Sequence, residues 1–175
     1  MQSSLLQRLD LFARALTPFV LTLLLLLLSL TPLRSPYLAP VMPSIALIAV
    51  YYWTVFRPDL MPSGAVFLIG LLHDLGGVAP LGIGVLALLA VHGAVGAQRR
   101  FFATAGFGLL WLAFAVLAAA AQLFIWLLSC AMIGRLVDIA PALLQYAVTL
   151  AIYPCLFWLF GRAQQLLLRD AETVR

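Results

Sequence analysis

A histidine and an aspartate, His73 and Asp74, stand side by side in the segment GLLHDLGGVAPLG, which runs from Gly70 to Gly82. An adjacent imidazole and carboxylate can relay a proton or contribute to a metal site. An aspartate near a helix end can instead accept hydrogen bonds from backbone amides. The whole chain is 65% hydrophobic and 9% charged, and an ionisable pair in such surroundings is a candidate functional or structural site.

We expect Asp74 to act through hydrogen bonds rather than catalysis, accepting them from the amides of the Gly76–Gly77 turn. This would order the GGVAP segment, so that Pro80 starts the next helix and Gly82 lets the two helices pack closely. The sequence leaves open whether the charge of Asp74 is also needed. His73 would face a different direction and be more replaceable.

A shared metal site would need a second ligand near His73, which the spacing does not provide. His92 is the only other histidine, and in a hairpin that turns near Val78 it lies roughly 13 Å deeper than His73. Cys130 and Cys155, on antiparallel helices, would differ in depth by roughly 20 Å, whereas a disulfide needs Cα atoms within about 7 Å. We therefore expect two free thiols and neither a metal ion nor another cofactor.

The motifs of membrane enzymes are incomplete. An intramembrane serine protease needs an activated serine, and Ser63 followed by Gly64 is a fragment of such a motif whose position after Pro62 predicts a helix cap. A metal-dependent phosphotransferase needs clustered aspartates, whereas Asp59 and Asp74 stand apart. The glycines do not have the spacing of a phosphate-binding loop. We expect no enzymatic activity.

The composition predicts an integral membrane protein. Mean hydropathy is +1.13, and a chain with so few charged residues cannot form the polar exterior of a soluble domain. All ten basic residues are arginine and the isoelectric point is about 9.6. Because no basic patch carries interleaved aromatic residues, this charge favours anionic lipids at the membrane surface and not nucleic acid.

Proline, glycine and arginine clusters divide the chain into six apolar pieces of about the length that a membrane span requires. The prediction is therefore an all-α bundle of about six transmembrane helices in a single polytopic domain, residues 1–175. The expected spans are 12–33, 37–56, 60–75, 80–97, 102–132 and 139–160.

The fifth expected span is long for one perpendicular helix and short for two, which favours a single tilted or bent helix. It carries small residues at helical spacing, a pattern that lets another helix approach closely. We expect these residues either to contact a partner helix or to pack against other spans of the same chain. They are Ala115, Ala118, Ala119 and Gln122.

The triplet Arg57, Pro58 and Asp59 predicts a helix end at a membrane interface, because proline cannot continue the preceding helix. With six spans and the N-terminus inside, only Arg34 and Arg135 fall outside, and the positive-inside rule places both termini in the cytoplasm. The inner arginines are then Arg8, Arg14, Arg57, Arg99, Arg100, Arg162, Arg169 and Arg175.

The six-span layout carries YYW (51–53) before RPD (57–59), a Gly-x-x-x-Asp motif at Gly70 and Asp74, and Pro-Leu-Gly at 80–82. In this combination the chain resembles the rod shape-determining membrane protein family, MreD. The layout agrees over the whole chain, and the specific motifs are confined to residues 51–82. The family's bundle is similar to the substrate-binding subunits of energy-coupling-factor transporters.

The resemblance implies a non-enzymatic subunit of the bacterial cell-elongation machinery in the inner membrane. Its partner would be a bitopic MreC-like protein, which connects it to the MreB filament, to RodA and to a class B penicillin-binding protein. The alternative is a vitamin-binding subunit of an energy-coupling-factor transporter. Such a subunit needs polar groups that converge on a pocket in the outer half of the bundle.

Overall fold

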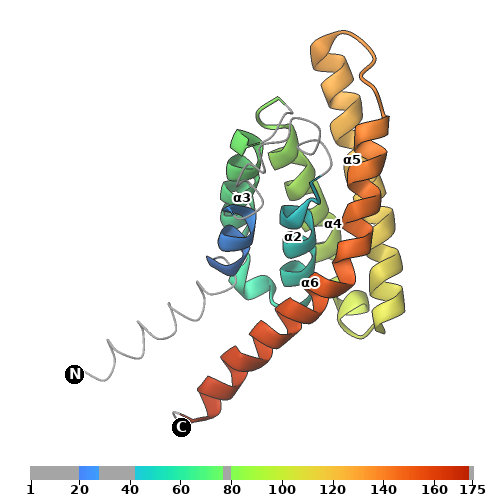
Figure 1. Cartoon of the computed structure of the whole chain (residues 1–175). Helices are drawn as coiled ribbons and strands as arrows, with labels where there is room; N and C mark the ends of the chain where they lie inside the picture. Colours follow the sequence, from blue (N-terminus) through green and yellow to red (C-terminus); the bar gives the residue numbers. More distant parts are fainter. Residues whose placement is uncertain (1–19, 28–41, 77–79, 174–175) are drawn as a thin grey trace, which may run out of the picture.

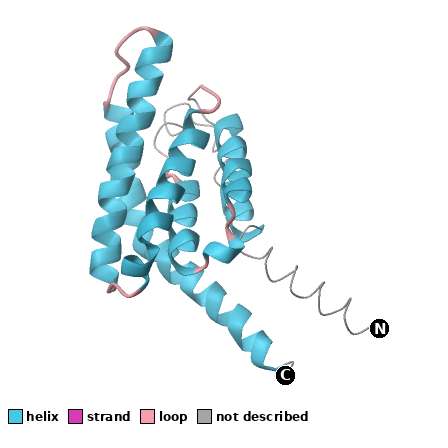
Figure 2. Ribbon diagram, turned by 180° about the vertical axis from the view of Figure 1, so that it is seen from behind, coloured by secondary structure: helices cyan, strands magenta, loops and turns pink. Residues whose placement is uncertain are grey.

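The computed structural model describes residues 20–27, 42–76 and 80–173. Residues 20–27 are helical. The elements that follow are α2 (Ile45–Phe56), the short 3-10 helix η2 (Pro58–Leu60), α3 (Ser63–Gly76), α4 (Ile83–Ala103), α5 (Phe107–Ile133) and α6 (Ala140–Thr173). No strand occurs in these ranges (Figure 2), so the expected all-α class is confirmed for them.

Helix α4 lies at the centre of the bundle, because it packs against α2, α3 and α5. Helix α6 packs against α2 and α5. Ten of the twelve residues of α2 are buried, as expected for a helix that is apolar on every side. Helices α5 and α6 form an antiparallel hairpin whose connecting turn extends beyond the shorter helices (Figure 1).

Two segments, Phe107–Ile133 and Ala140–Gln165, are long and apolar enough to cross a membrane. Only 11% and 22% of their most apolar stretches are buried in the molecule, whereas the core helix of a soluble protein would be mostly buried. Helices α2 and α3 have 12 and 14 residues, fewer than the about 20 of a full span. Most of the first expected span, and residues 37–41 of the second, lie outside the described residues.

The fifth expected span, 102–132, is one helix over most of its length, as predicted, but its expected start at Phe102 is wrong, because α4 continues to Ala103 and α5 begins at Phe107. Helices α4 and α6 continue beyond the ends expected for the fourth and sixth spans, Ala97 and Phe160, and reach Ala103 and Thr173; where each span ends in the membrane stays a prediction. Hydropathy set those predicted ends, yet arginine, glutamine and leucine are good helix formers and extend a helix beyond its apolar part. The expected cap at Ser63 is also wrong, because Ser63 is the first helical residue and the Pro62 carbonyl accepts the first hydrogen bonds of α3.

An aromatic core joins α2, α5 and α6 near the end at which α2 terminates. Tyr51 lies 5.3 Å from Phe114 and 6.1 Å from Tyr153 between ring centroids, and Tyr153 stacks on Phe114 at 4.4 Å. The Tyr51 hydroxyl donates to the Leu110 carbonyl of α5 at 3.0 Å. This core fixes α2 inside the group of longer helices.

Helix α6 contains Pro154, which cannot donate a backbone hydrogen bond to the Leu150 carbonyl four residues earlier. The indole Nε1–H of Trp111 on α5 donates to that carbonyl at 3.4 Å. The neighbouring helix therefore supplies the donor that proline lacks, as is usual for proline within apolar helices.

Candidate functional site

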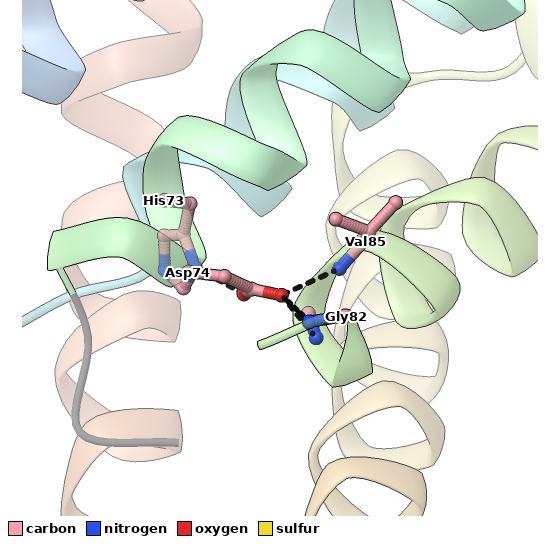
Figure 3. Close-up of polar contacts among 5 residues, drawn as sticks. His73, Asp74, Gly82 and Val85 are labelled. Atoms are coloured by element: carbon pink, nitrogen blue, oxygen red, sulfur yellow. Dashed lines mark hydrogen bonds and ion pairs between the residues drawn. The ribbon is translucent and has the colours of Figure 1, made fainter. Parts of the chain in front are cut away.

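Asp74 lies near the end of α3 with its side chain 2% exposed. Its Oδ2 accepts three backbone hydrogen bonds, from Gly82 at 2.8 Å, Gly84 at 3.1 Å and Val85 at 3.2 Å. Figure 3 shows the carboxylate of α3 reaching across to the first turn of α4. The expected hydrogen-bonding role is thus present, but these donors lie at the start of α4 and not at the turn expected at residues 76–77, of which Gly77 lies outside the described residues.

The start of α4 explains why a carboxylate is needed there. The first amides of any helix have no partner within the helix, and the N-cap position of α4 is Gly82, which has no side chain to cap them. Asp74 supplies the acceptor from the preceding helix. Its negative charge also lies at the positive end of the α4 dipole, where it is favourable.

Pro80 and Gly82 shape the turn that leads into α4. The Ile83 amide donates to the Pro80 carbonyl at 3.4 Å, and Gly82 has a φ of +97° and a ψ of −21°, values that suit the third residue of a type II turn. Pro80 was expected to start the helix, but it precedes the first helical residue by three positions. Gly82 is required for its backbone conformation, because L side chains rarely adopt this φ.

The close approach of α3 and α4 depends on two other glycines. A Cβ atom on Gly70 would lie 2.8 Å from the Val85 Cα, and one on Gly84 would overlap the Asp74 carboxylate. At Gly82, nothing lies within 4 Å of such an atom. The expectation that Gly82 permits the close packing is therefore corrected, and Gly70 and Gly84 have that role.

The two histidines have separate environments. His73 Nδ1 lies 3.5 Å from Asp74 Oδ1, and its side chain is 28% exposed. His92 Nδ1 lies 2.9 Å from the Thr54 hydroxyl oxygen. The Thr54 hydroxyl also donates to the Val50 carbonyl at 2.6 Å, an arrangement that favours the tautomer in which His92 Nδ1 carries a proton and donates to Thr54.

A small pocket with three polar side chains in a mostly apolar lining lies beside His73. Its volume is about 20 Å³, enough for about one water molecule. Its polar side chains are Ser44 at the start of α2, His73, and Gln122 of α5, and Gly84 forms part of its wall. Three segments of the chain therefore bring polar side chains together that the sequence alone did not connect.

Most of the small-residue face of α5 is used within the chain. Ala118 is buried, the Ala115 carbonyl accepts from the Tyr146 hydroxyl at 3.1 Å, and Gln122 donates to Gln145 at 3.0 Å. Ala119 alone among the four is exposed. Of the two readings that the sequence allowed, packing against the same chain holds for three positions.

The RPD residues lie at the other end of the helices from Asp74. Arg57 is the C-cap of α2, and Pro58 begins η2 with Asp59 in its only turn. The prediction of a helix end is confirmed, and these residues do not join the Asp74 site. Cys130 and Cys155 are free thiols, as their spacing predicts.

The sequence reasoning missed Gly84 and Val85. Gly70 and Asp74 lie four residues apart and so share a face of α3. Gly82 and Gly84 follow after the connection to the next helix. That combination could have indicated that the start of the next helix, which contains glycine, packs against this face of α3. It does not indicate which amides reach the carboxylate.

The site has the chemistry of a structural junction. One carboxylate oxygen of Asp74 is shared by three amides and the other faces His73. Within the described ranges, no group of three or more His, Cys, Asp or Glu side chains is arranged to hold a metal ion. Comparisons with protein-family models, curated proteins and solved structures find no match for this chain.

Proposed function

We propose that the chain is a non-enzymatic, multi-pass subunit of the bacterial cell-elongation machinery, which binds an MreC-like bitopic protein in the inner membrane. The observation that most supports this proposal is the contact between α3 and α4. Gly70, Asp74 and Gly82 belong to the motif on which the resemblance to MreD rests, and all three serve one helix-to-helix contact. A motif that determines how helices pack is what a scaffold protein requires.

Membrane insertion is supported by the surfaces of α5 and α6. Large apolar side chains on these helices are strongly exposed, including Leu112 at 61%, Val116 at 64% and Leu143 at 58%. Lipid or a partner helix would cover them. We propose the six-span topology, with both termini in the cytoplasm, as the arrangement that also follows the arginine distribution.

The pocket beside His73 is too small to be the vitamin-binding site that the alternative requires. Pockets for ligands of that size have volumes of about 300 to 1,000 Å³, and the pocket beside His73 has about 20 Å³. In this proposal the chain acts by lateral contacts between helices, with MreB, RodA and a class B penicillin-binding protein reached through the bitopic partner.

Depletion of the protein in its own bacterium, together with affinity capture of the tagged full chain, tests this proposal. We expect rod-shaped cells to become round on depletion, and the MreC-like protein of the same bacterium to be captured in stoichiometric amounts. An unrelated polytopic membrane protein with the same tag is the control. Unchanged cell shape with no captured bitopic partner would contradict the proposal. Thermal stabilisation by a vitamin would instead support the alternative.

A further inference from the structure

Helix α6 changes character near Gly161. The segment before it is apolar and contributes Tyr153 and Phe160 to the core, whereas Arg162, Gln164 and Gln165 follow it. At 34 residues, α6 is about 51 Å long, which exceeds a hydrocarbon layer of about 30 Å. In the proposed topology α6 therefore leaves the hydrocarbon near Gly161 on the cytoplasmic side.

One face of α6 holds this region against the other helices. Phe160 lies 5.3 Å from Tyr52 between ring centroids, and the Tyr52 hydroxyl donates to Gln164 at 3.1 Å. These contacts fix the rotation of α6 about its axis, so a second face points away from α2.

Trp158 and Arg162 lie on that second face, four residues apart. The Arg162 guanidinium carbon lies 5.1 Å from the centroid of the Trp158 ring, and the tryptophan is 62% exposed. No ion pair joins Arg162 to any carboxylate in the described part of the chain. A stacked guanidinium keeps its N–H edge free, and this edge matches two oxygens of a phosphate group.

We propose that Trp158 and Arg162 form a binding site for the phosphodiester of an anionic phospholipid in the cytoplasmic leaflet. The Trp158 Cα lies about 6 Å nearer the hydrocarbon along the helix than the Arg162 Cα, and indole rings collect at this boundary of membranes. The arginine then reaches the phosphate level. This inference rests on the proposed membrane insertion of α6.

Charge complementarity supports an anionic lipid as the occupant. Arg57, Arg99 and Arg100 lie at the ends of α2 and α4, which are at the same end of the molecule as this part of α6 (Figure 1). Among the described residues that connect α2 to α3 and α4 to α5, Asp59 is the only carboxylate, while Asp170 and Glu172 lie farther along α6. At the opposite end, Arg135 is accompanied by Asp138.

Native mass spectrometry of the full-length protein, purified in detergent and mixed with phosphatidylglycerol or phosphatidylcholine, tests the site. We expect Arg162→Gln to weaken phosphatidylglycerol binding about fivefold and Trp158→Leu to weaken it about two- to fivefold. Arg135→Gln is the matched control, which removes the same charge at the other end and should leave binding unchanged. Circular dichroism verifies that each variant keeps its helix content.

Three results would overturn the lipid site. Arg162→Gln and Arg135→Gln could weaken binding equally, which would indicate a general charge effect. Phosphatidylcholine could bind as tightly as phosphatidylglycerol, or inorganic phosphate could stabilise the protein as much as the lipid. Loss of the lipid site would leave partner capture intact, whereas failure of the proposed function would remove partner capture and leave lipid binding in place.

Discussion

The α3–α4 junction and the α5–α6 hairpin show two ways of holding helices together. At the α3–α4 junction the backbones approach so closely that only glycine fits at positions 70 and 84, and one carboxylate satisfies three amides. In the α5–α6 hairpin, long aromatic side chains reach across to carbonyl oxygens, such as Trp111 to Leu150 and Tyr146 to Ala115. Close backbone contact should therefore tolerate substitution far less well than side-chain bridges do.

The largest expected effect is that of Gly84→Ala. The added methyl group overlaps the Asp74 carboxylate, so the carboxylate must shift relative to its three amides, two of which are buried. We expect a loss of about 3 kcal/mol or more in the free energy of unfolding. Thermal unfolding in detergent measures it. Gly96→Ala is the control in the same helix, because nothing lies within 4 Å of its Cβ position. Equal losses of stability in both variants would contradict the close contact between Gly84 and Asp74.

Gly70→Ala should have the next largest effect. Its Cβ would lie 2.8 Å from the Val85 Cα, and a backbone atom cannot move aside as a flexible side chain can. We expect a destabilisation of about 1 to 3 kcal/mol. Gly64→Ala in the same helix meets no neighbour and should be neutral or stabilising by up to about 1 kcal/mol. The measurement is the melting temperature of each variant. Equal melting temperatures for Gly70→Ala and Gly64→Ala would contradict close packing at Gly70.

Trp111→Phe should destabilise the α5–α6 hairpin by about 1 kcal/mol, because the Leu150 carbonyl loses its indole donor. Pro154→Ala would restore an amide that can donate to this carbonyl. The loss caused by Trp111→Phe should therefore be smaller in the Pro154→Ala background. A double-mutant cycle measures this coupling, and strictly additive effects would show that the two residues act independently.

His73→Ala should have the smallest effect, within about 0.5 kcal/mol. Its ring is 28% exposed and lies 3.5 Å from Asp74, so the carboxylate keeps all three amides after the change. Unfolding and cell-shape assays on this variant separate the two members of the pair. A loss comparable to that of Gly84→Ala would mean that His73 positions Asp74.

The sequence predicted the all-α class, a single helix for most of the span expected at 102–132, and a hydrogen-bonding role for Asp74, because hydropathy and a carboxylate in an apolar segment are local signals. It did not predict the donors to Asp74, since these depend on how α4 is placed against α3. It assigned close packing to Gly82, although Gly70 and Gly84 permit it. A glycine in the sequence does not show why the position lacks a side chain. Only the structure shows whether the reason is a positive φ, as at Gly82, or a close neighbour, as at Gly84.

The pocket beside His73 illustrates the same limit. Ser44, His73 and Gln122 come from three helices far apart in the chain, and no periodicity within one helix connects them. The small-residue face of α5 is a related case, because the sequence left open whether it contacts a partner or the same chain. Small residues at helical spacing indicate close approach, but Ala118 approaches the chain's own helices.

Comparison of Asp74→Asn with Asp74→Ala tests the central claim most directly, that Asp74 acts as the acceptor that caps α4. All three amides converge on Oδ2, so the amide oxygen of asparagine can replace it, whereas alanine offers no acceptor. The measurement is rescue of cell shape by each variant, with its abundance in the membrane quantified in the same cells. We predict that Asp74→Asn retains shape and abundance and that Asp74→Ala loses both; failure of Asp74→Asn at normal abundance would contradict the account and show that the charge itself is required.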